Sequence, residues 1–184
     1  MNVDLARTHA FRLAFIARNI AFYRTLASLG ENYTQNFWIY VSNNFLDMAV
    51  LEWCKVFGSR AEETHWSNIV EEHDAFRDNM LVELSLTREQ WDSYWEEMKD
   101  YRARGVAHAS LTNPPTRYPH LDNALHSSAF YYRYLVEELR KAEENPLYLL
   151  PGDLMRYYEP LLAHAKEVAS VAYGASREIV DNIR

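Results

Sequence analysis

The chain has 184 residues, which is long enough for one domain with a hydrophobic core and short for two. Hydrophobic residues make up 48% and charged residues 24%, which excludes wholesale disorder, and five glycines and six prolines leave little sequence for the turns of an all-β fold. The formal net charge of −7 argues against a broad phosphate-binding surface, although it allows a small local site. We therefore expect a single domain over residues 1–184.

Apolar residues at helical spacing predict three helices in the first half of the chain. The first covers residues 3–29 and stops before Gly30. The second covers about residues 32–57 and ends at Gly58, and apolar side chains lie nearly all around it, which is typical of a helix enclosed by neighbours. A third helix is expected over about residues 68–84.

Capping and helix-breaking residues predict the helices of the second half. The sequence from Thr87 to Gln90 is a capping box, so a helix begins there and runs to about Val106. Prolines between residues 111 and 119 predict a loop. The next helix is expected over about residues 121–143.

The last predicted helix begins after Asp153, which is a typical N-cap residue. It bends or breaks at Pro160 and continues to about residue 181. All the predicted elements are helical, and no internal repeat or linker indicates a second domain. Together they predict an all-α fold, an up-and-down bundle of four main helices plus one or two extra helices.

The chain carries 13 tyrosines, eight phenylalanines and five tryptophans. We expect these rings to fill the space between helices, with polar tips at the surface. The alternative is stacking on bases, which requires a basic groove nearby.

Neither a signal peptide nor a membrane span is expected, and hence no membrane partner. The first residues lack a basic region followed by an apolar run, and no stretch approaches about 18 uninterrupted apolar residues. Cys54 is the one cysteine, so an internal disulfide is impossible and a reducing cytoplasm is the natural setting. It lies in an apolar helical stretch beside Trp53, which argues against a nucleophilic role.

Strong catalytic and metal-binding motifs are missing from the sequence. It contains no Gly-rich phosphate loop, Cys-x-x-Cys, His-Glu-x-x-His or Gly-x-Ser-x-Gly. His65, His73 and several acidic residues cluster between residues 62 and 74, but their spacing matches no metal motif, and a solvated acidic face is the better interpretation. We therefore expect neither a metal nor a cofactor.

Arg102 and His108 are the candidate catalytic residues. An arginine can hold a phosphate through two parallel hydrogen bonds, and a histidine can exchange a proton near neutral pH, which together suffice to cleave RNA without a metal. On a regular helix Arg102 and His108 would point about 120° apart, whereas Arg104 would share a face with His108. Gly105 can let the backbone leave regular geometry, or a symmetric dimer can complete the site.

Several segments together resemble the abortive-infection-type branch of the HEPN superfamily, over about residues 35–135. They are Phe37-Trp38, Asp47–Gly58, His65-Trp66, Tyr101-Arg102 with Val106–His108, and Tyr118–Asp122. The resemblance implies a helical bundle, commonly a homodimer, with Arg-x(4–6)-His motifs facing each other across the interface. Many members are metal-independent ribonucleases, often toxins or anti-phage effectors, and others are inactive binding or scaffold modules.

The chain departs from the active pattern of that family at Ala103. Active members often carry Asn, Asp or His after the motif arginine, and here no acid follows His108 to orient its imidazole. The departure favours a module that binds a nucleotide, RNA or a protein partner. A metal-independent endoribonuclease with an Arg-x5-His motif at a dimer interface is the alternative.

Asp47 is a candidate supporting residue, because it lies among apolar neighbours on the helix expected to be enclosed. A buried carboxylate is costly unless it is paired, so Asp47 should meet Arg102 or Arg104. Glu52 is the other acid in the same position. An ion pair that only fixes the helix register is the alternative to a role in catalysis.

Overall fold

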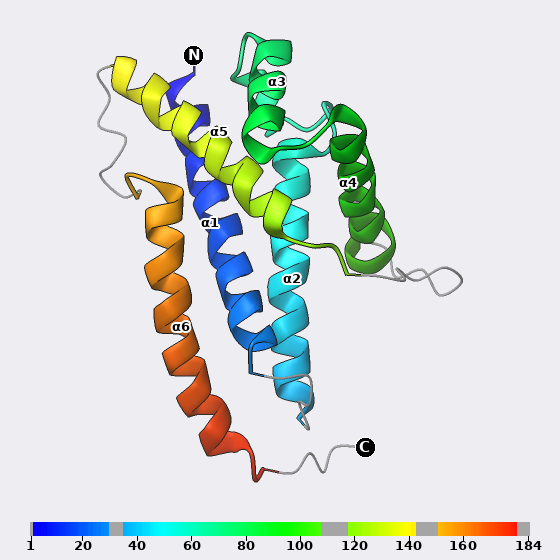
Figure 1. Cartoon of the computed structure of the whole chain (residues 1–184), viewed down its shortest axis with the longest axis vertical. Helices are drawn as coiled ribbons and strands as arrows, with labels where there is room; N and C mark the ends of the chain where they lie inside the picture. Colours follow the sequence, from blue (N-terminus) through cyan, green and yellow to red (C-terminus); the bar gives the residue numbers. More distant parts are fainter. Residues whose placement is uncertain (1, 30–34, 108–117, 143–150, 180–184) are drawn as a thin grey trace.

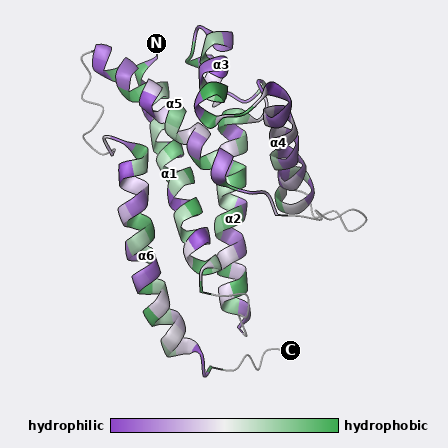
Figure 2. Ribbon diagram, viewed as in Figure 1, coloured by the Kyte–Doolittle hydropathy of each residue, from purple (hydrophilic) through white to green (hydrophobic). Residues whose placement is uncertain are grey.

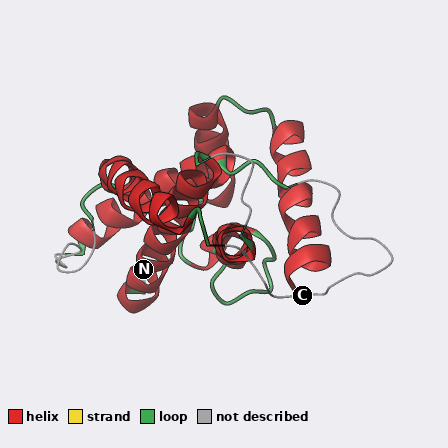
Figure 3. Ribbon diagram, turned by 90° about the horizontal axis from the view of Figure 1, so that it is seen from below, coloured by secondary structure: helices red, strands yellow, loops and turns green. Residues whose placement is uncertain are grey.

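The computed structural model describes residues 2–29, 35–107, 118–142 and 151–179, and within these ranges every regular element is helical (Figures 1 and 3). The α-helices are α1 (Val3–Ala27), α2 (Asn36–Phe57), α3 (His73–Leu84), α4 (Arg88–Tyr101), α5 (Asp122–Lys141) and α6 (Leu154–Ser176). A 3-10 turn (Trp66–Asn68) precedes α3, and a π-helix (Arg102–Ala107) follows α4. The prediction of an all-α fold is confirmed for this part of the chain.

Helix α1 lies at the centre of the molecule and contacts α2, α5 and α6 (Figure 1). Its buried face includes Ala6, Ala10, Ala17 and Ala21, which are completely buried. The distance between packed helices depends on the side chains at the contact, so this alanine-rich face lets the neighbouring helices approach closely. Long apolar side chains such as Leu13 fill the remaining space.

An aromatic cluster joins α2 to α4 and α5. Trp53 on α2 is completely buried, and its ring centroid lies 5.3 Å from that of Phe57 and 5.6 Å from that of Tyr94. Its indole Nε1 donates a hydrogen bond of 3.1 Å to Ser127 Oγ on α5. Aromatic pairs at such distances contribute beyond their burial alone. The expectation that rings fill the space between helices is therefore met in this cluster.

The capping residues act as predicted. Thr87 Oγ1 accepts a hydrogen bond from Gln90 N at 3.2 Å, and Gln90 Oε1 accepts one from Thr87 N at 2.8 Å, which completes the capping box. Asp153 accepts a hydrogen bond from Arg156 N at 2.8 Å, and α6 continues through Pro160. The loop predicted for residues 111–119 lies mostly outside the described residues.

Helices α3 and α4 differ from the prediction at one end each. Helix α3 begins at His73 rather than near residue 68, because the chain first forms the 3-10 turn, where His65 Nδ1 accepts a hydrogen bond from Ser67 N. Helix α4 keeps α-helical geometry only to Tyr101. Both differences lie next to the candidate site, and they determine which of its side chains meet.

Helix α6 is the least enclosed of the helices. It runs along α1, its C-terminal end contacts Trp38 at the start of α2, and only Leu154 and Tyr158 of its residues are buried (Figure 1). An apolar groove of about 380 Å³ separates its second half from α1 and α2. In Figure 2, α4 is the most hydrophilic helix, which fits its position at the edge of the molecule. In the part of the chain that is described, no helix is both long and apolar enough to cross a membrane.

Candidate functional site at the end of α4

The candidate motif begins where α4 changes from an α-helix into a π-helix at Arg102. Hydrogen bonds in a π-helix join residues five apart, and single π-turns occur frequently at functional sites. Gly105 lies within this turn, so the hypothesis that the backbone leaves regular geometry here is confirmed. His108 lies outside the described residues, and its convergence with Arg102 stays a prediction.

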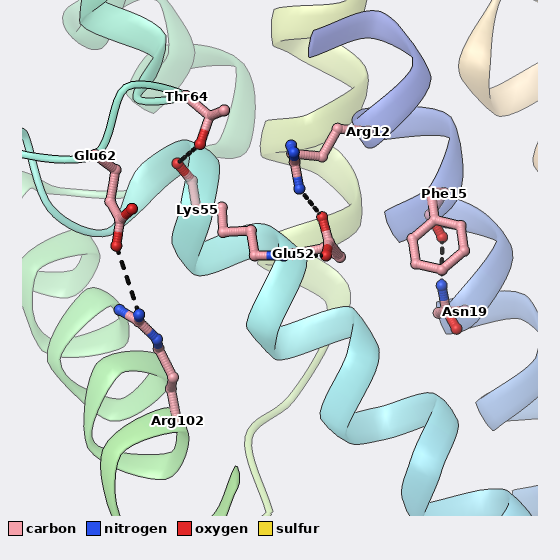
Figure 4. A network of polar contacts seen from close by, with 8 residues as sticks. All are labelled: Arg12, Phe15, Asn19, Glu52, Lys55, Glu62, Thr64 and Arg102. Atoms are coloured by element: carbon pink, nitrogen blue, oxygen red, sulfur yellow. Dashed lines mark hydrogen bonds and ion pairs between the residues drawn. The ribbon is translucent and has the colours of Figure 1, made fainter. Parts of the chain in front are cut away.

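Arg102 pairs with Glu62, which lies in the loop that follows α2 (Figure 4). Arg102 Nη2 lies 3.5 Å from Glu62 Oε1, and the side chains are 32% and 37% exposed. Ion pairs with this exposure contribute at most about 1 kcal/mol to stability. Solvent reaches the guanidinium, and an incoming anion can compete with Glu62 for it.

Arg104 pairs with Asp100 one turn earlier in the chain, and its side chain is about one-third exposed. Its Nε atom is buried and has no hydrogen-bond partner among the described residues. Arg102 and Arg104 thus lie two residues apart on the π-helix, and each is held by a different carboxylate.

The expectation that Asp47 pairs with Arg102 or Arg104 is wrong. Asp47 accepts a hydrogen bond of 2.8 Å from the hydroxyl of Tyr101, the last residue of α4. Burial, together with this hydrogen bond, raises the pKa of Tyr101 well above its ordinary value, so the hydroxyl keeps its proton and stays a donor. Asp47 therefore anchors the end of α4 to α2.

Glu52, the other acid considered on α2, forms the buried ion pair of this region (Figure 4). Its side chain is 9% exposed and binds Arg12 of α1, and its second oxygen lies 2.6 Å from Lys55 Nζ. A buried ion pair between two helices is suited to fixing their register.

The loop of residues 59–65 is held firmly between α2 and the 3-10 turn. Thr64 Oγ1 donates to the carbonyl of Lys55 at 2.9 Å (Figure 4), and Asn68 Nδ2 donates to the carbonyls of Glu62 and Glu63. This network fixes the position of Glu62 against Arg102.

A cavity of about 200 Å³, which we call the tryptophan cavity, opens between this loop, α3 and α4. Its lining consists of Phe57, Gly58, Arg60, His65, Trp66, Arg77, Met80, Trp91, Asp92 and Trp95. The sequence reasoning missed this cavity. The available signal was the i, i+4 spacing of Trp91 and Trp95, which places both rings on one face of the helix.

The cluster between residues 62 and 74 is only partly a solvated face. Glu63, Glu71, Glu72 and Asp74 are exposed, as expected. His65 is instead buried, and burial, with the positive charges of Arg60 and other neighbours, lowers its pKa to about 4. The described ranges contain no group of three or more His, Cys, Asp or Glu side chains arranged to hold a metal ion.

Cys54 is buried, as the sequence predicts. Burial raises the pKa of its thiol to about 12, so the reactive thiolate does not form at neutral pH. This finding agrees with the interpretation that Cys54 is not a nucleophile.

No family model, no curated protein and no solved structure matches the chain. The resemblance to HEPN domains therefore stays a prediction.

Proposed function

We propose that the chain is a HEPN-like helical bundle of the prokaryotic defence type that binds the phosphate of a nucleotide or RNA through Arg102. One observation carries the proposal: Arg102 lies on a π-turn at the surface, about one-third exposed, and is held only by the partly exposed carboxylate of Glu62. Arg104, two residues further along, points to another side of the turn and adds positive charge nearby. A guanidinium matches a phosphate in two parallel hydrogen bonds, which are stronger than hydrogen bonds between neutral groups.

A phosphate can take the place of Glu62 at Arg102, because the contact between Glu62 and Arg102 is long and solvent-accessible. The net charge of −7 makes the rest of the protein repel nucleic acid. Binding should therefore be local and weak, and it should decrease steeply as salt is added.

The assembly is part of the same proposal. A homodimer, as the resemblance implies, would bring two copies of the π-turn together and double the positive charge available to one ligand. The up-and-down arrangement of four main helices and a cytoplasmic location belong to the proposal too. The buried free thiol of Cys54 supports a reducing compartment.

Metal-independent RNA cleavage is the second candidate function. The ribose 2′-hydroxyl would lose its proton to water and its oxygen would attack the adjacent phosphorus, while Arg102 would stabilise the charged phosphorane. The P–O5′ bond would break as His108 donates a proton to the departing 5′-oxygen, which leaves a 2′,3′-cyclic phosphate. The π-turn favours this candidate, because single π-turns occur frequently at functional sites. Ala103 argues against it, since it provides no polar group beside the arginine.

The binding proposal is tested with Arg102→Gln. At low salt, fluorescence anisotropy with a labelled RNA should show binding to the wild type and about tenfold weaker binding to the variant, the effect of losing one charge-assisted contact. Arg88→Gln is the matched control, because Arg88 is an exposed arginine of α4 that pairs with Asp78. Equal affinities of the wild type and Arg102→Gln would sink the proposal, and capture of a protein partner without any RNA binding would favour the protein-binding alternative.

Cleavage is tested separately with structured RNA in a chelator, comparing the wild type with His108→Ala. Cleavage that disappears in the variant favours the ribonuclease, and binding without cleavage favours the binding module. Cleavage that persists in His108→Ala contradicts the role given to His108.

A further inference from the structure

The tryptophan cavity contains two arginines without a close carboxylate. The side chain of Arg77 is only 20% exposed, and its ion-pair contact is with the exposed Asp74 at 3.9 Å, which is beyond hydrogen-bond distance. Arg60 lines the same cavity and forms no ion pair with any described residue. Arg77 also lies over the ring of Trp66, 6.0 Å from its centroid, but this contact does not neutralise its charge. A mostly buried guanidinium without a close carboxylate favours a negatively charged occupant of the cavity.

Two neutral hydrogen-bond donors line the cavity beside these arginines. His65 Nδ1 accepts a hydrogen bond from Ser67 N at 3.2 Å, so the hydrogen of the neutral ring is assigned to Nε2. That N–H and the indole N–H of Trp91 are not among the buried polar atoms that lack a partner, so solvent reaches both of them. The indoles of Trp53 and Trp95 are different, since they donate to Ser127 Oγ and to the carbonyl of Phe57.

Acceptors are scarce in the same cavity. Asp92 is the carboxylate in its lining, and this residue is exposed on α4. Solvent-accessible donors without an acceptor in the protein are free to donate to a ligand. A phosphate or carboxylate provides several acceptor oxygens at once.

The apolar part of the lining selects a flat group. The rings of Phe57, Trp66, Trp91 and Trp95 line the cavity, and such surfaces stack on planar ligands. A volume of about 200 Å³ is below the range of about 300 to 1,000 Å³ that is usual for drug-sized ligands. The space suits one ring with one acidic group, and it excludes a strand of RNA.

We infer that the tryptophan cavity is a binding site for a small aromatic anion, with its phosphate or carboxylate at Arg60 and Arg77 and its ring against the tryptophans. The site uses none of the residues proposed to bind RNA phosphate. The loop of residues 59–65 presents Arg60 to the cavity and Glu62 to Arg102.

The test is a titration followed by the indole N–H signals of the five tryptophans in a ¹H–¹⁵N spectrum. The probes are phenyl phosphate, benzoate, adenosine monophosphate and inorganic phosphate. Phenyl phosphate or benzoate should shift the Trp91 signal, assigned with Trp91→Phe, in a saturable way. The Trp38 signal should stay unshifted, because Trp38 donates to Ser176 Oγ far from the cavity. The better of these two probes identifies the acidic group, and tighter binding of adenosine monophosphate would identify a nucleotide as the natural ligand.

Variants locate the site. Arg60→Gln and Arg77→Gln should each weaken binding about tenfold, the effect of losing one charge-assisted contact. Arg88→Gln and Arg102→Gln should leave it unchanged, which separates this site from the proposed RNA site. Arg60 is an exposed loop residue, so its variant keeps the test valid if Arg77→Gln fails to fold. The inference is overturned if no probe gives a saturable shift at millimolar concentration, if Arg60→Gln binds as tightly as the wild type, or if inorganic phosphate binds as tightly as phenyl phosphate.

Discussion

Two arginine–glutamate pairs lie on either side of the C-terminal half of α2, and they differ in burial (Figure 4). The Glu52 side chain, paired with Arg12 of α1, is 9% exposed, whereas that of Glu62, paired with Arg102, is 37% exposed. The same two chemical groups therefore serve different purposes. The first pair joins two helices of the core, and the second leaves its arginine available to a ligand.

The physical cause of this difference is the surrounding medium. In the interior, a charge without its partner lacks water to replace it, so Arg12 and Glu52 depend on each other. At the surface, water and dissolved ions compete with Glu62 for Arg102, so another anion can replace Glu62 at a small cost in free energy.

The largest effect is expected from Glu52→Ala. Removing this carboxylate leaves Arg12 partly buried beside an emptied site, and the free energy of unfolding should fall by about 3 kcal/mol or more, measured by urea denaturation. The double variant Arg12→Met/Glu52→Leu should recover most of that loss, because it removes both charges and keeps apolar volume, while Lys55 can reach solvent. A loss below about 1 kcal/mol in the single variant would show that burial does not distinguish the two pairs.

The next effect is acid destabilisation through His9, which belongs to the same buried region. His9 is completely buried and its Nδ1 lies 2.8 Å from Tyr131 Oη, while its Nε2 has no partner among the described residues. Burial, with the charge of Arg12, lowers the pKa of His9 from 6.5 to about 4. Between these two pH values the unfolded chain binds more protons than the folded one, so stability present above pH 6.5 is lost as the pH falls towards 4.

A pKa shift of this size corresponds to a loss on the order of 3 kcal/mol at the lower pH. His65, whose pKa is also lowered to about 4, adds to the same trend. The free energy of unfolding, measured by urea denaturation at pH 6.5 and at pH 4, should therefore change less between the two pH values in His9→Phe than in the wild type. The variant His126→Gln, at an exposed histidine, should show the same change as the wild type. An unaltered pH dependence in His9→Phe would contradict the assignment.

Local signals predicted the starts of α4 and α6, and only the packed structure reveals the contacts of the site. Thr87 and Asp153 cap helices through bonds to residues three positions away, so their roles can be read from neighbouring residues. The partner of Asp47 depends instead on how α4 is rotated about its axis. Neighbouring residues of a helix point about 100° apart, and the rotation presents Tyr101 to Asp47 and turns Arg102 towards Glu62.

The same limit explains why the tryptophan cavity was missed. Its lining comes from the end of α2, the following loop, α3 and α4, so no contiguous pattern encodes it. His65 Nδ1 caps the 3-10 turn by accepting a hydrogen bond, and this turn buries His65 and Trp66. The sequence pattern predicted a helix start near residue 68 and did not indicate this cap. A pattern of apolar spacing indicates which residues are buried, but it does not indicate which donors are left without acceptors.

The smallest effect on stability is expected from Glu62→Gln, which tests the exposed member of the comparison. Stability should change by less than about 1 kcal/mol, because the pair with Arg102 is solvent-accessible. Affinity for RNA should increase severalfold at low salt, since the carboxylate that competes with phosphate is gone, and the gain should vanish in Glu62→Gln/Arg102→Gln. Asp78→Asn is the matched control, since it releases Arg88, an exposed arginine at the start of α4. If Asp78→Asn raises the affinity as much as Glu62→Gln does, net charge explains the gain and Arg102 has no special role. A gain confined to Glu62→Gln means that Glu62 occupies Arg102 in the free protein and that a phosphate displaces this carboxylate on binding.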